Sequence, residues 1–419
     1  MSRPMTLWQS QFEHNLKELA AIESPEYDAS TQSVASFKQV SFQSYLQKFI
    51  NATPGLAAIY PPELEHSILA ACNTLYRHPS LVEHLTLMSK LLPSLYSSSV
   101  FSALASFMIA KSLNYEAERM ELAFLAGLLH DIGFLYYPVS HDYNHINESS
   151  IADAAIRAHG PVAAGVIRRL NNAPLHLADI IRDHHEYCNG TGYPSRKSAD
   201  TLHSVVFIIN ITDLISRAAK EYAIYPKHSH QLIRLVLLLN QGQIPNEIYR
   251  TAIRLILQKP DCIEPPMVMP DIAELLQQRL TICNAMATMA SALKLLQKHQ
   301  AIDNCRAATR IHRQLQAAFQ QIGIDQEEYH KWLKQHKGQL SLEVINSFVI
   351  QNEICHQLAR LFTALTEANK SLSPMEACLK TQVTDLLTTT ALPPLVMPAI
   401  NTAEDVFDTP KMHNSVQNQ

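Results

Sequence analysis

The stretch LAFLAGLLHDIG, residues 122–133, is an apolar helical run that ends in a histidine and an aspartate, His130 and Asp131. Burying this pair at the end of an apolar helix costs free energy unless each group is hydrogen-bonded, ion-paired or coordinated. The alternative is an ordinary helix end with a solvated His-Asp pair. The segment therefore predicts a buried helix, and its two terminal polar side chains become candidates for a site.

Two adjacent histidines follow in PLHLADIIRDHHEY, residues 174–187. His184 and His185 stand at three- and four-residue offsets from Ile180 and Ile181, so a helix would bring both imidazoles to the edge of its apolar face. The alternative is a solvated histidine pair flanked by acidic residues. The segment by itself leaves both interpretations open.

A lone aspartate lies on the apolar face of a third predicted helix. In VVFIINITDLI, residues 205–215, Asp213 follows apolar residues at helical spacing. A carboxylate there is unfavourable unless a cation or several hydrogen-bond donors hold it. The alternative is an ion pair with Arg217 in the next turn. His159, which lies between two predicted helices, would by itself be taken for a surface or capping histidine.

Taken together, these side chains offer four imidazole and two carboxylate ligands from separate helices of one bundle. Eight of the 20 histidines fall between residues 130 and 213, so the sequence concentrates imidazoles here. Mixed nitrogen and oxygen ligands suit iron, manganese or zinc, and a shared carboxylate holds two metals about 3.5–4 Å apart in many hydrolases. We therefore expect hydrolysis by a metal-bound hydroxide, with these candidate ligands: His130, Asp131, His159, His184, His185 and Asp213.

Composition excludes several other classes of protein. Of 419 residues, 47% are hydrophobic, yet no apolar run reaches the roughly 18 residues of a membrane span. The net charge of −4 gives no basic field for nucleic acid, and no secretory signal opens the chain, so we expect a cytoplasmic protein. The seven cysteines are scattered and never spaced as Cys-x-x-Cys, which argues against a disulfide framework and a thiolate zinc site.

Helical periodicity runs through most of the chain, without a convincing alternating strand, and predicts an all-α fold. We expect an accessory helical region over residues 1–80 and the metal-binding domain over 81–259. The Pro-rich stretch DCIEPPMVMPD, residues 261–271, suggests a boundary before a C-terminal helical region over 260–375. Residues 376–419 are expected to be a disordered tail because polar residues and prolines dominate there.

One predicted helix of the C-terminal region carries a broad apolar stripe. In residues 342–368 the stripe includes Val344, Phe348, Leu358 and Leu365, and a single helix cannot bury it alone. Two partners are open. The stripe packs either within the chain on residues 272–322 or on a second copy, as a homodimer.

Three motifs together resemble the HD-GYP family, the phosphodiesterase branch of the HD superfamily of helical bundles. HDIG (130–133) is followed by HHEYCNGTGYP (184–194), similar to the family's His-His-Glu segment leading into Gly-Thr-Gly-Tyr-Pro, and then by ITD (211–213). The similarity extends from about residue 92 to 256.

This resemblance implies a function for the residues. A phosphodiesterase of this family opens cyclic di-GMP to linear pGpG or GMP in bacterial signalling, with two divalent metals, iron or manganese in preference to zinc. The six candidate ligands would hold the metals, with Asp131 bridging them and acting with His130 in catalysis. The loop beside the substrate would consist of Gly192, Tyr193 and Pro194.

The sequence departs from the family's pattern where cations and one metal ligand are usual. Phe134 replaces the lysine after HDxG, and the stretch 92–100 lacks the usual glutamate and histidine. The usual phosphate-binding arginine is missing or displaced to Lys220 or Lys227. Losing one such donor costs on the order of 10²-fold in rate or more. A second hypothesis is therefore a degenerate module that binds metal and a nucleotide or partner protein without turnover.

Overall fold

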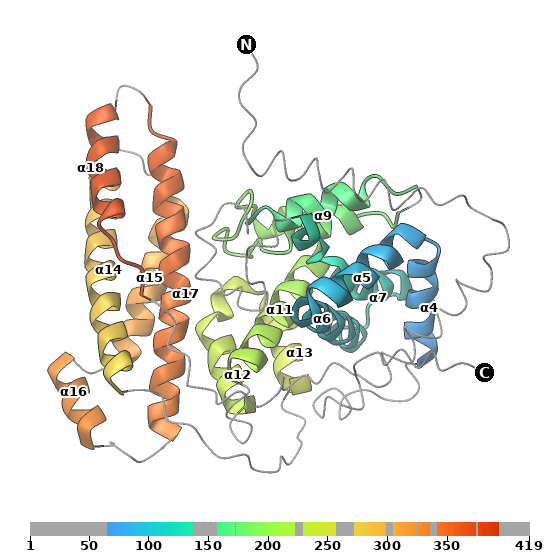
Figure 1. Ribbon diagram of the computed structural model, residues 1–419, viewed down its shortest axis with the longest axis horizontal. Coiled ribbons are helices and arrows are strands. Elements are labelled where there is room, and N and C mark those ends of the chain that lie inside the picture. Colours follow the sequence, from blue (N-terminus) through green and yellow to red (C-terminus); the bar gives the residue numbers. More distant parts are fainter. Residues whose placement is uncertain are drawn as a thin grey trace, which may run out of the picture.

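The computed structural model describes residues 65–136, 157–171, 173–222, 229–256, 272–298, 305–322, 326–335, 342–373 and 376–393. Every regular element in these ranges is a helix, as the all-α prediction required (Figure 1). Within the same ranges, no helix is both long and apolar enough to cross a membrane.

The first group of helices surrounds the predicted site. Prolines begin two of them: Pro79 starts α5 and Pro93 starts α6, where a missing backbone N–H costs nothing. The group consists of α4 (Glu65–Tyr76), α5 (Pro79–Leu91), α6 (Pro93–Ser112), α7 (Ala117–Leu129), η2 (Ile132–Tyr136), α9 (His159–Ile167), α10 (Leu177–Asp183), η5 (Ala199–Thr201), α11 (Ser204–Glu221), α12 (Ser229–Leu239), η7 (Gln241–Gln243) and α13 (Asn246–Ile256).

Helix α7, which delivers His130 and Asp131, packs closely on α6. The two backbones approach so nearly that a Cβ at Gly127 would lie 2.7 Å from the carbonyl oxygen of Ser102. Small buried residues on α6, including Ser102 and Ser106, make this approach possible. The eight residues from Leu122 to Leu129 are buried as a result, which fixes the end of the helix in the core.

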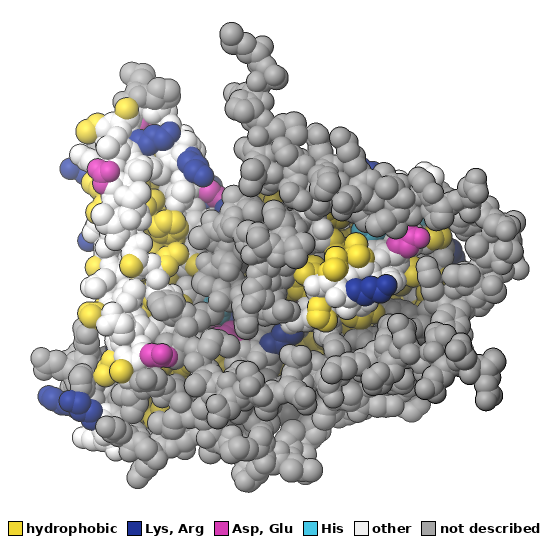
Figure 2. Space-filling model, viewed as in Figure 1, with side chains coloured by type: hydrophobic (Ala, Val, Ile, Leu, Met, Phe, Trp, Pro, Cys, Tyr) yellow, Lys and Arg dark blue, Asp and Glu magenta, His cyan; other side chains and the backbone are white. Residues whose placement is uncertain are grey.

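The second group of helices forms a bundle beside the first, with α17 on the side that faces α11 and α12 (Figure 1). Its members are α14 (Ile272–Lys298), α15 (Arg306–Ile322), α16 (Gln326–Gln335), α17 (Leu342–Lys370) and α18 (Ala377–Thr388). On the face seen in Figure 2, basic and acidic side chains are interspersed over this bundle.

The apolar stripe on α17 is buried within the chain. Val344, Phe348, Leu358 and Leu365 each have no exposed surface, and α17 packs against α14 and α15. The stripe is therefore buried within the chain, in part against residues 272–322 as predicted and, at Phe348, against Tyr222 of α11.

The predicted disordered tail was wrong in part, and other predicted ranges lie outside the described residues. Residues 377–388 form α18 and not a disordered tail, because Leu379, Val383 and Leu387 bury an apolar face against α14 and α17. Residues 1–64, most of the predicted accessory region, lie outside the described residues. So does the Pro-rich stretch 261–271, and the domain limits stay predictions.

Candidate metal centre

His130 caps the C-terminal end of α7 and is completely buried. Its Nδ1 lies 2.9 Å from the carbonyl oxygen of Gly127, which can only accept, so Nδ1 carries the hydrogen. Nε2 is buried without a hydrogen-bond partner among the described residues. Burial lowers the pKa of His130, but the carboxylates of Asp131 and Asp213 outweigh it and raise this pKa to about 9. The surroundings of Nε2 thus favour a positive charge at this atom. Either a proton or a metal ion can provide that charge.

His159, His184 and His185 bring their Nε2 atoms together. Nε2 of His159 lies 3.0 Å from Nε2 of His184 and 3.2 Å from Nε2 of His185. Nδ1 of His184 donates to the carbonyl oxygen of Ile181 over 2.6 Å, which leaves its Nε2 lone pair for the cluster. Burial, followed by the neighbouring imidazoles, holds the pKa values of His184 and His185 well below the usual value. Both rings are therefore neutral at pH 7, as metal ligands must be.

Asp131 lies between these histidines and His130. Its Oδ2 is 3.3 Å from Nε2 of His130, and its Oδ1 is 3.5 Å from Nε2 of His159. Burial raises the pKa of Asp131 to about 6, although the neighbouring His130 opposes the shift. One carboxylate thus faces two imidazole groups, the arrangement that a bridging ligand requires.

Asp213 approaches from α11, with Oδ1 3.9 Å from Nε2 of His130. Burial raises its pKa, but His130 outweighs burial and the net pKa is lowered. The predicted alternative was an ion pair with Arg217, but in the described part of the chain Arg217 pairs with Glu221 at 3.0 Å and with Glu353 at 2.9 Å. The structure therefore gathers the six predicted side chains from four segments of the chain. We call His130, Asp131, His159, His184, His185 and Asp213 the histidine centre.

Two glycines of the predicted motifs allow this gathering. A Cβ at Gly133 would overlap the carbonyl oxygen of His159, so glycine lets the HDIG turn lie directly against the start of α9. A Cβ at Gly192 would overlap the backbone at His185 and Glu186. The loop can therefore fold back, and the Tyr193 N–H donates to the carbonyl oxygen of His185 over 3.1 Å.

The loop 186–197 forms one wall of the centre. The ring of Tyr193 stacks on His185, with centroids 4.6 Å apart, while Pro194 is exposed. The fully buried Glu186 holds the loop by accepting from the backbone N–H groups of Ser195 and Lys197 at 2.5 and 3.0 Å. The predicted loop residues Gly192 and Tyr193 thus lie beside the histidine centre.

Sequence reasoning missed Asn210, which braces the turn after α10 from the facing α11. Its Nδ2 donates to the carbonyl oxygens of His184 and Glu186 at 2.6 and 2.9 Å. An uncharged asparagine within an apolar helix was the only available signal. That signal did not identify the hydrogen-bond partner, the carbonyl oxygen of His184, because it lies 26 residues away.

Two departures from the family pattern have structural explanations. Phe134 is 4% exposed and stacks on the ring of His159 with centroids 4.3 Å apart, so it is part of the core. Lys220 donates from Nζ to the carbonyl oxygen and the hydroxyl of Ser94 at 2.7 and 3.0 Å. Burial lowers the pKa of Lys220 to about 8, although Asp131 and Asp213 oppose the shift. Lys227 lies outside the described residues.

The donor set fits a divalent metal. The ligand atoms of His159, His184 and His185 lie within 4.8 Å of one another. Together with Nε2 of His130 and the two carboxylates, these ring nitrogens form a set of nitrogen and oxygen donors without thiolates. Iron, manganese and zinc all accept such a set. A backbone carbonyl orients His130 and another orients His184, as usual for imidazole ligands.

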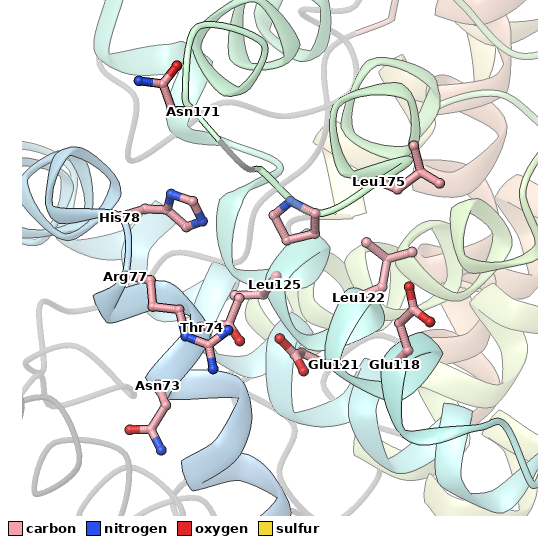
Figure 3. Close-up of a pocket in the computed structure, with 11 residues that line it drawn as sticks. Asn73, Thr74, Arg77, His78, Glu118, Glu121, Leu122, Leu125, Asn171 and Leu175 are labelled. Carbon is pink, nitrogen blue, oxygen red and sulfur yellow. The ribbon is translucent and has the colours of Figure 1, made fainter.

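A cavity of about 520 Å³ lies elsewhere, between α4, α7 and residues 171–175. Figure 3 shows Arg77 and His78 on one side and two glutamates of α7 on the other. Because carboxylates repel an anion as strongly as Arg77 attracts it, this cavity is a poor match for a phosphate ligand. It shares no residue with the histidine centre, and its lining consists of Asn73, Thr74, Arg77, His78, Glu118, Glu121, Leu122, Leu125, Asn171, Pro174 and Leu175.

A comparison with known families identifies one domain of the chain. Residues 79–228 match the family model described as HD domain, a range that contains all six side chains of the histidine centre. The chain therefore contains an HD domain. The match does not reach the narrower HD-GYP family, which stays a prediction.

Two solved structures are similar to part of the chain. One is the HD domain of the L. monocytogenes phosphodiesterase PgpH, at 18% identity and a TM-score of 0.32, covering 41% of this chain and 94% of that chain. The other is the same domain in complex with cyclic di-AMP, at 16% identity and a TM-score of 0.32, covering 44% and 100%. TM-scores this low place no constraint on what the present chain binds. No curated protein matches the chain.

Proposed function

We propose that this protein is a metal-dependent phosphodiesterase that hydrolyses cyclic di-GMP to pGpG or GMP. The observation that carries the proposal is the convergence of Nε2 atoms from His159, His184 and His185 beside a buried carboxylate of Asp131. Such a group of converging imidazole nitrogens, two of them on neutral rings, is well matched to a cation.

The centre divides into two sets of ligands that share Asp131. One set adds His159, His184 and His185, and the other adds His130 and Asp213. Two divalent metals, iron or manganese in preference to zinc, fit these sets. The second set is smaller because residues 92–100 supply no imidazole.

Each part of the centre has a role in the proposed hydrolysis. A divalent metal supplies a Lewis acid that activates water and polarises the phosphate. His130 and Asp131 would act in catalysis as ligands, with Asp131 shared between the two sets. Tyr193, whose ring stacks on His185 and lies under the guanidinium of Arg157, would position the loop beside the substrate. Gly192 keeps the same wall close to the histidines.

A second candidate is a module that binds metal and nucleotide without turnover. The favouring observation is Phe134, which stands where the family has a phosphate-binding lysine and is packed into the core against His159. A site without that cation stabilises the charge of the transition state less well.

Metal analysis and a turnover assay on the full chain test both candidates. The phosphodiesterase requires metal at one or two ions per chain and release of pGpG or GMP from cyclic di-GMP, with cyclic di-AMP as the comparison nucleotide. His176→Asn, at an exposed histidine at the start of α10, is a matched control and should keep both. Full metal and tight cyclic di-GMP binding without product would favour the binding module. A chain that takes up neither iron nor manganese would contradict both.

A further inference from the structure

Arg360 reaches the loop of the histidine centre from α17, far along the chain. Its Nη2 donates to the hydroxyl of Thr191 over 2.9 Å, and its guanidinium carbon lies 4.4 Å from the centroid of the Tyr187 ring. Arg360 is only 7% exposed. The guanidinium is therefore held rigidly against the loop that carries Gly192 and Tyr193.

The charge of Arg360 has no acidic partner among the described residues. No carboxylate in that part of the chain lies within ion-pair distance, and apart from the contacts to Thr191 its N–H groups make no hydrogen bond to the described residues. A buried cation without a counter-charge is unfavourable, because desolvation is not repaid. An arrangement of this kind is expected where a ligand brings the missing negative charge.

Other guanidinium groups make the same side of the loop cationic. Arg157 and Arg196 both pair with a single carboxylate, Glu367 of α17. The guanidinium carbon of Arg157 lies 5.2 Å from the centroid of the Tyr193 ring, and its Nε is buried without a hydrogen-bond partner in the described part of the chain. Arg157 and Arg196 thus share one carboxylate, and Arg360 adds a third guanidinium group on the same loop.

This cationic group borders the histidine centre. Tyr193 contacts Arg157 and also stacks on His185, so one ring joins the two sets of residues. Arg360 contacts Thr191, and the neighbouring Gly192 lies directly against the backbone of His185 and Glu186. An anion bound at the centre would therefore lie near the guanidinium of Arg360.

We propose that Arg360, assisted by Arg157, binds a phosphate group of the ligand at the histidine centre. A guanidinium fork suits phosphate oxygens, and here it is delivered by the C-terminal bundle in place of the lysine that Phe134 replaces. The identity of the ligand as a nucleotide rests on the proposed function. Anion binding by Arg360 does not, and inorganic phosphate can probe it directly.

A purely structural role for Arg360 predicts different behaviour. Suppose that Arg360 only fixed the loop. Removing the hydroxyl of Thr191, its hydrogen-bond partner, would then weaken phosphate binding as much as removing Arg360 does. A phosphate-binding Arg360 should instead tolerate Thr191→Val, because the charge remains. Removing an uncompensated buried charge should also leave the free protein about as stable as before.

Calorimetric titration of the metal-loaded full chain with inorganic phosphate tests the proposal. We expect Arg360→Met to weaken phosphate binding at least about tenfold with unchanged metal content, and Arg360→Lys to weaken it less. Thr191→Val should stay within about threefold of the parent protein. Arg313→Met, at an exposed arginine of α15, is the matched control for loss of one positive charge and should bind phosphate as the parent does.

Equal phosphate binding by Arg360→Met and the parent, including no binding by either, would overturn the proposal. Equal weakening of phosphate binding by Thr191→Val and Arg360→Met would also overturn it, because that outcome indicates a purely structural role for Arg360. Phosphate binding that depends on Arg360, in a protein that neither binds nor cleaves cyclic di-GMP, would support the anion site and contradict only the proposed function.

Discussion

Two buried clusters of histidine and carboxylate groups lie along α11, about two turns apart. The histidine centre includes Asp213, and the second cluster includes Arg217 and Glu221 of α11 with Glu353 and His356 of α17. We call Arg217, Glu221, Glu353, His356 and Asn240 the paired network. Both clusters place several ionisable groups in the interior, where isolated charges are unfavourable.

The paired network satisfies its own carboxylates. Glu353 accepts from Asn240 at 2.7 Å on one oxygen and from Arg217 at 2.9 Å on the other. Glu221 accepts from the Tyr222 hydroxyl at 2.9 Å on one oxygen, and from Arg217 at 3.0 Å on the other. Each carboxylate oxygen therefore has a donor, and the network joins α11, α12 and α17 without needing a ligand.

The histidine centre lacks this balance. Nε2 of His130 has no hydrogen-bond partner in the described residues, and the Nε2 atoms of His159, His184 and His185 face one another. The comparison teaches that burial and residue type do not distinguish a ligand site from a structural ion network. The pairing of charges does, because carboxylates meet a guanidinium in the paired network, whereas three imidazoles face one another in the histidine centre and are matched to a cation.

The largest expected effect concerns metal binding by the histidine centre. Asp131→Ala should lower metal affinity by at least about 100-fold and remove both ions, because its carboxylate faces both ligand sets. His159→Ala should remove one ion, since His159 belongs to one set. Elemental analysis of the two purified variants measures this difference, and equal losses would contradict the bridging role of Asp131.

The paired network should behave in the opposite way. Glu353→Ala leaves Arg217 buried without one of its two partners, and should cost about 3–5 kcal/mol of unfolding free energy. Metal content of the folded protein should stay unchanged. Urea unfolding and metal analysis on the same sample test both statements. Metal loss from a folded Glu353→Ala protein would break the distinction between the two clusters.

A third prediction concerns Phe134, whose ring packs against the histidine centre at His159. Phe134→Lys would restore the charge that the family resemblance calls for, but it replaces a buried ring stacked on His159. We expect a loss of about 3 kcal/mol of stability and no gain in hydrolysis. Thermal unfolding beside Phe134→Leu, which keeps an apolar side chain, provides the measurement and its control. A stable Phe134→Lys protein with faster turnover would show that this position can bind phosphate.

The smallest expected effect is a pH dependence of the paired network. Burial raises the pKa of Glu221, but His356 and Arg217 outweigh burial and lower it to about 2, against 4.5 for an ordinary glutamate. Because the folded-state pKa is the lower one, the stabilisation is complete above about pH 4.5 and is lost as pH falls towards 2.

Glu221→Gln should therefore cost about 2 kcal/mol at pH 7. The gap between the urea midpoints of parent and variant should narrow below about pH 4.5. A gap that stays constant from pH 7 to about pH 3 would mean that the Glu221 carboxylate is not selectively stabilised in the folded protein.

Much of the fold could be predicted from local pattern. The helical spacing of apolar residues predicted the all-α class, because that signal acts within a few residues of the chain. The disordered-tail prediction was wrong for residues 377–388. Their polar composition does not reveal that α14 and α17 offer an apolar groove to Leu379, Val383 and Leu387.

The sequence by itself determined the all-α class and the six candidate ligands, because short motifs set which residue types occur on which helix face. Their assembly depended on close backbone contacts at Gly133 and Gly192 that the motifs already contained. Only the tertiary structure decided that Arg217 belongs to the paired network, that Phe134 is a core residue and that Arg360 reaches the loop at Thr191. These outcomes depend on contacts between segments 113 to 169 residues apart, or on packing between separate helices, and no local spacing encodes such contacts.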